Sequence, residues 1–189
     1  FILPYTIQNY LSTDINNRPP SADSSEFIKA EKNVKDRLKR LLSIDGHSTV
    51  DSFHRRLGKI MWDNAGMARN EAGLIKAIAD INGLKEEFWK EIKIPGNMET
   101  VNNELEKASR VADFLELGEL IARDALHRKE SCGGHFREEF QTDDGETMRN
   151  DEEFRYVAAW EYKGEGNDPF LHREALNFEV VQPEQRSYK

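Results

Sequence analysis

The sequence predicts a mainly α-helical fold, an antiparallel bundle of three to four helices followed by a small C-terminal β-ribbon. Between residues 23 and 134, apolar residues recur at steps of three and four, the spacing of one buried helix face. After residue 134 the apolar residues alternate with polar ones, as in a strand with one covered face. Short links between the helical stretches favour antiparallel neighbours.

Residues 1–22 are predicted to form an apolar lead-in and a linker. The segment Phe1–Leu11 is apolar, whereas Pro19 and Pro20 cannot donate backbone hydrogen bonds and disfavour a helix just before them. The chain starts with neither Met nor the pattern of a signal peptide. We therefore expect a piece of a longer protein, with another domain upstream.

Residues 23–134 are predicted to be the helical bundle. Its first helix begins at a capping box of Asp23 and Glu26 and ends at Asp45–Gly46, where glycine favours a helix end. Ser48 or Thr49 caps the second helix, which ends at Gly66. The apolar stripe of the first helix comprises Phe27, Ala30, Val34, Leu38, Leu41 and Leu42.

The third and fourth helices complete the predicted bundle. Asn70 caps the third helix, whose apolar period continues until Pro95–Gly96. The fourth and longest helix begins near Asn103 and ends at Gly133–Gly134.

Residues 135–189 are predicted to form a loop and a β-ribbon packed on the bundle. The first strand covers Phe154–Tyr162, Gly164–Pro169 forms a turn, and Leu176–Val181 forms the second strand. A ribbon of two strands is only marginally stable, so it must lean on the helices or on another domain.

The composition excludes several classes of protein. A net charge of −8 and a pI near 5.3 disfavour binding to nucleic acid. The apolar runs are far shorter than the roughly 20 residues of a membrane-spanning helix. Cys132 is the only cysteine, so an internal disulfide is impossible and a reducing compartment fits best.

No catalytic, cofactor-binding or metal-binding residue is predicted in this chain. Gly58, Gly66 and Gly73 are too widely spaced for a loop that holds the pyrophosphate of a dinucleotide. Cys132 and His135 have the spacing of metal ligands, but a structural zinc site usually needs four such ligands. Cys132 also lies at the carboxyl end of a predicted helix, where the dipole disfavours a reactive thiolate.

One polar cluster surrounds the paired glycines Gly133–Gly134 and is the candidate site for docking another domain. Carboxylates beside arginines favour oriented ion pairs, so an internal salt-bridge network is an equally good interpretation. The apolar Phe1–Leu11 and the aromatic Phe154–Tyr162 are core or, alternatively, surfaces that face another domain. The cluster comprises Glu130, Ser131, His135, Arg137, Glu138 and Glu139.

Three segments resemble the flavoprotein subunits of succinate dehydrogenase and fumarate reductase. Arg128–Phe140 reads RKESCGGHFREEF and resembles the segment R-x-E-S-R-G-A-H-x-R of that family. Met61–Asn70 and Arg186–Lys189 resemble a helix-end segment and the usual carboxyl terminus of the same family. Cys132 and Gly134 stand where many members have arginine and alanine, so the role of that arginine is absent or supplied differently here.

The resemblance implies the C-terminal module of such a subunit, with no cofactor in this piece and FAD in the parent subunit. The parent interconverts succinate and fumarate and passes electrons to an iron–sulfur subunit. This module packs on the upstream flavin-binding domain and helps to form the surface for the iron–sulfur subunit. The implied location is cytoplasmic, peripheral to the inner membrane through partner subunits, and the module alone is expected to be inactive.

Two alternatives remain open from the sequence. One is an autonomous helical protein-interaction module that docks its partner through the polar cluster. The other is the matching module of L-aspartate oxidase, which resembles this chain in fold and in a related Glu-Ser motif. The Arg186–Lys189 ending argues against L-aspartate oxidase.

Overall fold

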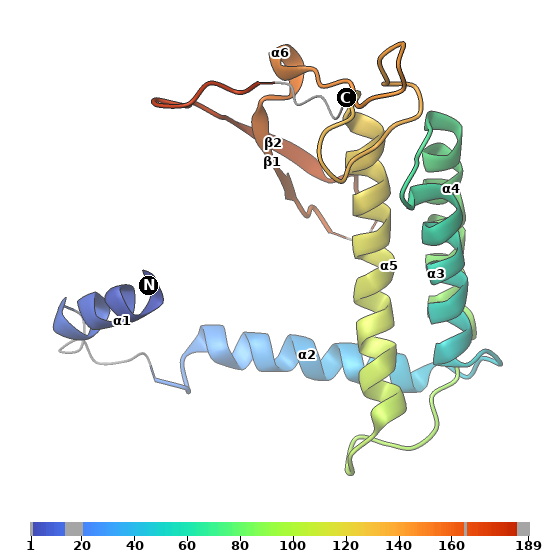
Figure 1. Cartoon of the computed structure of the whole chain (residues 1–189). Helices are drawn as coiled ribbons and strands as arrows, with labels where there is room; N and C mark the ends of the chain where they lie inside the picture. The colour runs from blue at the N-terminus through green and yellow to red at the C-terminus, as the bar shows by residue number, and fades with distance from the viewer. Residues whose placement is uncertain (1, 14–20, 165, 185–189) are drawn as a thin grey trace.

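The computed structural model describes residues 2–13, 21–164 and 166–184, and it confirms the mainly helical class with a small two-stranded sheet (Figure 1). Three helices stand together, a fourth crosses one end of them, and the ribbon lies at the other end. The elements in order are α1 Ile2–Thr13, α2 Ser25–Ser43, α3 Val50–Ala65, α4 Glu71–Glu91, α5 Asn103–His127, α6 Asp151–Phe154, β1 Tyr156–Glu161 and β2 Phe170–Ala175.

Helices α3, α4 and α5 form the bundle. Figure 1 shows α3 and α5 running in the same direction and α4 in the opposite one, so the antiparallel prediction holds for both pairs that are consecutive in the chain. The N-terminal parts of α3 and α5 lie side by side, as the distance of 3.6 Å between Lys107 Nζ and Asp51 Oδ1 shows.

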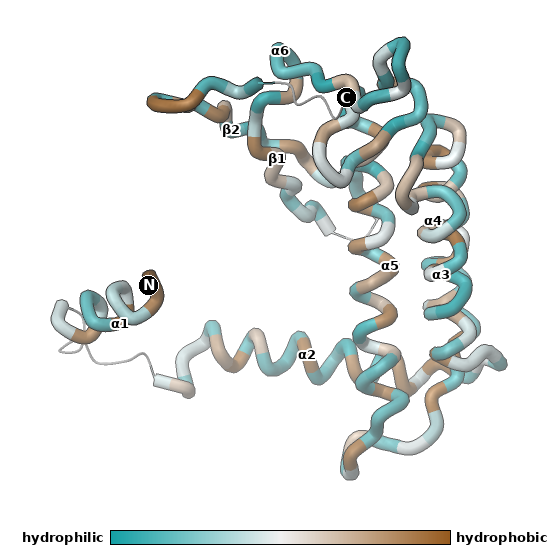
Figure 2. Tube along the Cα trace, viewed as in Figure 1, coloured by the Kyte–Doolittle hydropathy of each residue, from teal (hydrophilic) through white to brown (hydrophobic). Residues whose placement is uncertain are grey.

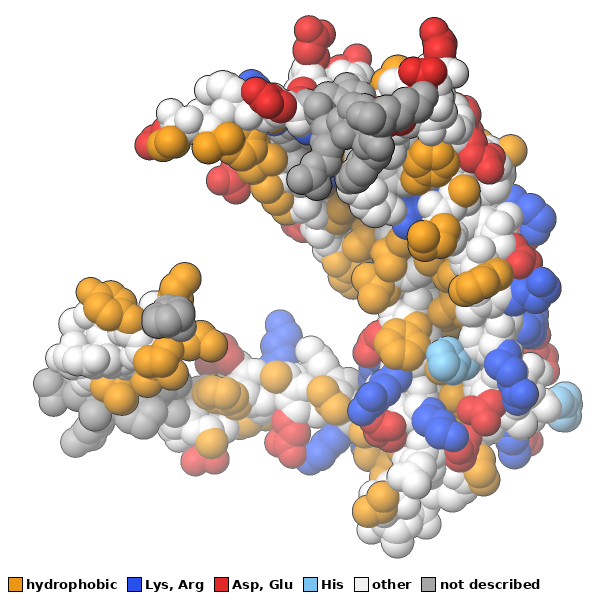
Figure 3. Space-filling model, in the orientation of Figure 1, with side chains coloured by type: hydrophobic (Ala, Val, Ile, Leu, Met, Phe, Trp, Pro, Cys, Tyr) orange, Lys and Arg blue, Asp and Glu red, His pale blue; other side chains and the backbone are white. Residues whose placement is uncertain are grey.

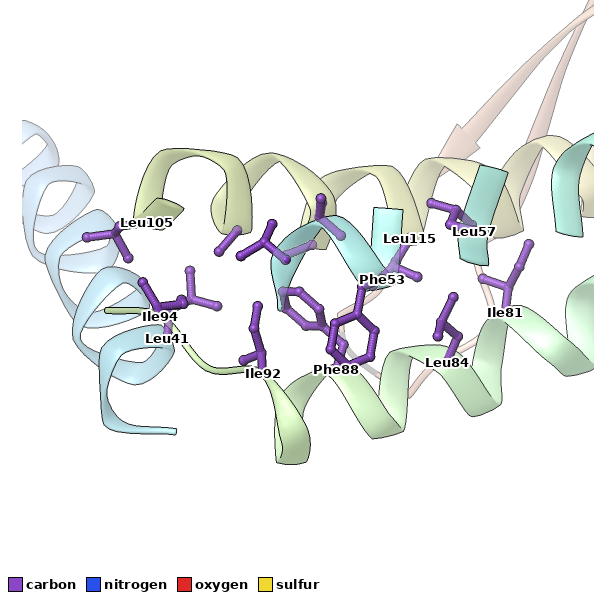
Figure 4. Close-up of a cluster of buried hydrophobic side chains, with 14 residues drawn as sticks. Leu41, Phe53, Leu57, Ile81, Leu84, Phe88, Ile92, Ile94, Leu105 and Leu115 are labelled. Atoms are coloured by element: carbon purple, nitrogen blue, oxygen red, sulfur yellow. The ribbon is translucent and has the colours of Figure 1, made fainter. Parts of the chain in front are cut away.

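The bundle core has two parts that differ in side-chain size. The larger cluster lies near α2 (Figure 4), and within it the rings of Phe53 and Phe88 meet edge to face at 5.3 Å. The smaller cluster, near the ribbon, contains Ala65, Leu74, Ala77, Ala122 and Ala125. Alanine fills little volume, so the helices approach closely there and overpacking is costly.

Helix α2 lies across the end of the bundle and touches it only through its C-terminal half (Figure 1). Leu41 is the one buried residue of α2. The predicted apolar stripe is therefore wrong for the N-terminal half, because Phe27 and Val34 are 50% and 59% exposed. The predicted capping box is also wrong, since α2 begins at Ser25 with Ser24 as its N-cap and no side-chain capping bond.

Several predicted helix ends are confirmed. The Thr49 side chain accepts a hydrogen bond from Ser52 N, and the Asn70 side chain accepts one from Gly73 N at 2.8 Å. Gly66 follows the last residue of α3, as predicted. Helix α4 ends at Glu91, ahead of the predicted stop at Pro95–Gly96.

The predicted end of the fourth helix is wrong. Helix α5 stops at His127 instead of Gly133–Gly134. The guanidinium of Arg137 occupies the space beyond the helix and bonds its last carbonyl groups, so the backbone turns away there. Gly133, with φ of 59°, serves the later turn between Cys132 and His135.

The first predicted strand is confirmed as β1, but the second lies earlier than predicted. Strand β2 pairs antiparallel with β1, with Glu161 opposite Phe170, because the glycines of the tight turn bring the chain back by Pro169. The alternating side chains of Leu176, Phe178 and Val180 are exposed instead of forming a strand.

The ribbon leans on α5 through polar contacts, as a two-stranded sheet requires. Trp160 Nε1 donates to Asp124 Oδ1 at 2.7 Å, and the Tyr156 hydroxyl lies 2.9 Å from His127 Nε2. Across the described residues, no helix combines the length and apolar character needed to cross a membrane. The Pro19–Pro20 break and the Arg186–Lys189 motif lie outside the described residues, and the three-part domain division stays a prediction.

Candidate docking surface

Arg137 is the centre of the predicted polar cluster and is almost fully buried, at 2% exposure. Its Nη1 donates to the carbonyl oxygens of Ala125 and Leu126 at 2.9 and 3.3 Å. Its Nε donates to Glu139 Oε2 at 3.1 Å. A cation at the carboxyl end of a helix also meets the favourable end of the dipole. Arg137 therefore caps α5 from within.

Ser131 and Glu130 join this internal network. The Ser131 hydroxyl accepts a bond from Arg137 N at 2.8 Å and donates to Arg137 O at 3.1 Å. The Glu130 carboxylate accepts from Arg128 Nε at 2.7 Å and from Asn150 N at 2.8 Å. Both side chains are buried, so they fasten the loops after α5 to each other.

His135 is half-buried with both ring nitrogens engaged. Its Nε2 lies 2.9 Å from the carbonyl oxygen of Arg128, and its Nδ1 lies 3.1 Å from Arg69 Nη1. A carbonyl only accepts and a guanidinium only donates, so the neutral ring with the proton on Nε2 satisfies both. Burial lowers the pKa of His135, and the nearby arginines act in the same direction while the Arg128 carbonyl opposes them. The ring is fixed and holds no nitrogen ready for a metal or a proton transfer.

Glu138 and Glu139 are the exposed members of the cluster, and they lie over the start of α4. Glu139 accepts from the backbone N–H of Glu71, and Glu138 accepts from Asn70 Nδ2 at 2.8 Å. Carboxylates are stabilised at a helix N-terminus. Burial alone would raise the pKa of Glu139, yet the bonds from the Glu71 backbone and Arg137 lower it.

The structure thus brings all six predicted residues together as the internal network that the sequence left open as an alternative. Glu130, Ser131 and Arg137 are buried, whereas Glu138 and Glu139 are exposed although they too bond to groups of this chain. A docking role for the cluster stays a prediction. Cys132 also lies in this region, where its backbone pairs with that of His135. No cluster of three or more potential metal ligands occurs within the described ranges.

A larger apolar surface lines a hollow between the arms of the molecule. Figure 3 shows hydrophobic side chains along α1 and α2, on the exposed side of α5 and under the ribbon, facing a common open space. Along α1, exposure is 78% for Ile2, 56% for Ile7 and 62% for Tyr10. No side chain of α1 is buried by the rest of the described chain. We call this surface, made up of the exposed apolar side chains of α1, α2, α5 and the ribbon, the hollow.

The sequence anticipated the hollow only in part. The sequence left open whether Phe1–Leu11 and the aromatic strand belong to the core or face another domain. Figure 2 shows the hydrophobic stretch at the start of α1 lying away from the bundle. The exposed apolar residues of α5 were not anticipated: Phe114, Leu117 and Ile121 are 41%, 52% and 40% exposed. Their spacing of three and four defines a second apolar stripe beside the buried one, which is the signal that was available.

Comparison with protein families identifies a match over residues 54–188 to a family described as the C-terminal part of fumarate reductase flavoproteins. Among curated relatives, a fumarate reductase flavoprotein subunit of Haemophilus influenzae is 26% identical over 169 residues, which cover 89% of this chain and 27% of that protein. A succinate dehydrogenase flavoprotein subunit of Bacillus subtilis is 24% identical over 177 residues, covering 92% and 29%. An uncharacterised FAD-dependent oxidoreductase of Methanocaldococcus jannaschii is 32% identical over 113 residues, covering 60% and 20%.

Solved structures show the same fold. A quinol fumarate reductase of E. coli superposes with a TM-score of 0.73 at 24% identity, over 87% of this chain and 27% of that one. The adenylylsulfate reductase of Archaeoglobus fulgidus superposes with a TM-score of 0.63 at 18% identity, over 94% and 28%. The chain therefore spans less than a third of the length of these relatives, so the likeness concerns one module of each.

Proposed function

This chain belongs to the family of fumarate reductase flavoprotein C-terminal domains, and from that premise we propose that it is the C-terminal module of a succinate dehydrogenase or fumarate reductase flavoprotein subunit. Its work is to pack on the flavin-binding domain of the same subunit. The parent subunit carries FAD and interconverts succinate and fumarate. The observation that carries the proposal is the hollow, an apolar surface that the described chain does not cover.

The hollow has the chemistry of a protein–protein contact. Large apolar patches on a soluble protein mark interaction sites, and burying one large apolar side chain contributes about 1.5–3 kcal/mol. Burial of the six exposed apolar side chains of α1 would therefore contribute about as much as the roughly 4–15 kcal/mol that association costs. These side chains are Ile2, Leu3, Tyr5, Ile7, Tyr10 and Leu11.

The proposal assigns FAD to the parent subunit's flavin-binding domain, and it assigns no chemical step to the residues of this module. A pyrophosphate cradle needs glycines that open a helix to the phosphates. Gly66 instead lies against the carbonyl of Trp62, and Gly73 lies against the Asn70 side chain that caps α4. The proposed contribution of this module is to hold the flavin-binding domain in place, and the flavin chemistry belongs to that domain.

A second contact, with the iron–sulfur subunit, is part of the proposal. Trp62 at the end of α3 and Met67 after it are 83% and 93% exposed, and both residue types are enriched in protein interfaces. The proposed location is cytoplasmic, peripheral to the inner membrane through the partner subunits.

Calorimetric titration of this chain with the separately produced flavin-binding polypeptide tests the proposal, followed by a fumarate-reduction assay on the mixture. We expect saturable binding and recovered turnover. Ile7→Asp should weaken binding at least tenfold, because it places a charge in the buried contact. The matched control Val101→Asp changes a 94% exposed residue between α4 and α5 and should bind like the unmodified chain. Absence of binding by the folded, unmodified chain would overturn the proposal.

A further inference from the structure

A groove of about 630 Å³ opens between the bundle and the turn of the ribbon. Its walls come from α4, α5, the end of β1 and the turn before β2. The apolar part of the wall includes Leu117 and Tyr162, which are 52% and 64% exposed, and Trp160 also lines the groove. Leu117 belongs to the hollow, so the groove is continuous with the proposed docking contact.

Charged residues that line the groove form a connected series of ion pairs. Lys85 Nζ lies 2.7 Å from Glu116 Oε2 and 2.9 Å from Glu119 Oε2. Arg123 bonds Glu119 Oε1 at 2.6 Å through Nε and Asp168 Oδ1 at 3.1 Å through Nη2. Burial alone would raise the pKa of Glu119, but the bonds from Lys85 and Arg123 lower it, so Glu119 is ionised at neutral pH.

The charges that line the groove do not balance. Three carboxylates, on Glu116, Glu119 and Asp168, share the two cations Lys85 and Arg123. The most exposed of these carboxylates are Asp168 and Glu116, whose side chains are 84% and 41% exposed, so the surplus negative charge faces solvent.

The other two acids on the wall are paired from outside the groove. Asp113 Oδ1 lies 2.6 Å from Arg37 Nη2, and Glu86 Oε2 lies 3.7 Å from Lys90 Nζ. Among the described residues, the lining therefore lacks one positive charge even when these outer cations are included.

We propose that this groove receives one arginine side chain of the flavin-binding domain, as the polar anchor of the docked contact. The stem of an arginine packs on apolar surface such as Leu117, and its planar head suits the carboxylates of Glu116 and Asp168. Aromatic rings such as those of Trp160 and Tyr162 favour a guanidinium over a neutral polar group. The proposal rests on the proposed function, and it adds which chemical group of the partner is recognised.

The double variant Glu116→Gln with Asp168→Asn tests the anchor by neutralising the two carboxylates that are proposed to bind the guanidinium. We expect it to weaken the calorimetric Kd for the flavin-binding polypeptide at least tenfold, as loss of a charged hydrogen-bonded pair requires. The control is Glu87→Gln with Asp63→Asn, the same change of composition at exposed ion pairs outside the groove, with Arg56 and Lys59. The control should keep the original Kd. Thermal unfolding and far-UV circular dichroism of both double variants verify that each is folded.

Arginine footprinting identifies the occupant. In the complex, one arginine of the flavin-binding polypeptide should resist phenylglyoxal when the unmodified chain is bound and react when the groove variant is bound at saturation. If the groove variant binds with an unchanged Kd, or if its complex protects the same arginines, the anchor is wrong while the proposed function stands. If the unmodified chain does not bind at all, both are overturned.

Discussion

Arg137 shows that a charged residue with the sequence pattern of a surface contact can be buried and hydrogen-bonded within the chain. Its hydrogen bonds go to the last turn of α5, to Ser131 and to Glu139, so the segment that carries the family resemblance also terminates the longest helix. Charge and spacing alone could not separate an inward from an outward guanidinium, because the choice depends on where α5 ends.

Arg137→Met should destabilise the chain by about 3 kcal/mol. Methionine fills much of the same volume but leaves two buried carbonyl groups and Glu139 without their donor. Urea unfolding followed by circular dichroism measures the loss. Arg55→Met, which changes an exposed arginine of α3, should alter the free energy of unfolding by less than about 0.5 kcal/mol. Equal effects at the two sites would contradict the capping role.

Gly46 is required by close packing of backbone on backbone. A Cβ placed there would lie 2.0 Å from the carbonyl carbon of Glu91, so Gly46→Ala forces the connection between α2 and α3 away from the end of α4. We expect a loss of about 3 kcal/mol in thermal or urea unfolding.

Gly83→Ala is the matched control, because a Cβ at Gly83 meets no atom within 4 Å in the interior of α4. Alanine is the better helix former, so this substitution should stabilise the chain by about 0.5–1 kcal/mol. Destabilisation by both substitutions would show that Gly46 is not special.

At the scale of the elements, helix periodicity predicted α3, α4 and the start of α5 well, because tertiary burial there follows one face per helix. It could not predict how α2 is used. Phe27 and Val34 have the spacing of a core stripe, yet nothing in the described chain covers them. Alternation likewise misplaced the second strand, since Leu176 to Val181 alternate without a sheet to join. In both places the pattern identifies apolar residues but does not show which surface packs against them.

The β-ribbon should loosen from α5 in mild acid because of His127. Its Nε2 is an acceptor for the Tyr156 hydroxyl and also lies 3.3 Å from Arg173 Nη2, a geometry that suits the neutral ring. Burial lowers the pKa of His127, and Arg173 lowers it further, while Asp124 opposes them. The unfolded chain then binds the proton more readily, so this contribution to stability is present above about pH 6.5 and is lost as the pH falls below that value.

Nuclear magnetic resonance checks this through the indole N–H of Trp160, which is bonded to Asp124. Its signal should shift toward that of a free indole between pH 7 and 5.5. With His127→Gln, the Trp160 signal should no longer change between pH 7 and 5.5. With His172→Gln, a substitution on the exposed part of β2, the signal should change with pH as in the unmodified chain. His135 also has a lowered pKa, so overall stability should retain some pH dependence in the His127 variant.

At the scale of the whole molecule, the bundle provides the stable part and the hollow provides the contact. The buried core lies between α3, α4, α5 and the end of α2, whereas α1 contributes nothing to it. The sequence predicted the helical class and the polar cluster, whereas the extent of the hollow is visible only in the structure. Exposure depends on the arrangement of whole elements, which no local pattern contains.

Hydrogen exchange should show this division directly. Amides of α1 and of the N-terminal half of α2 should exchange quickly in the isolated chain and slow markedly when the flavin-binding polypeptide is bound. Amides of α4 around Ile81, in the core, should be protected in both states. Mass spectrometry of peptic fragments gives both readings. Protection of α1 in the isolated chain would mean that a second copy or the chain itself already covers the hollow.

The way α2 is held has a mechanical consequence. It is fastened at one end only, by Leu41 in the core and by Arg37 to Asp113 of α5, and the part before Arg37 projects for about 18 Å at ~1.5 Å per residue. Such a helix is a lever, so a rotation of about 10° at its fastened end displaces the tip by roughly 3 Å over that length. The angle at this joint therefore sets where the tip of α2 lies relative to the bundle. Two such chains with identical contact residues will present that tip differently if the angle differs.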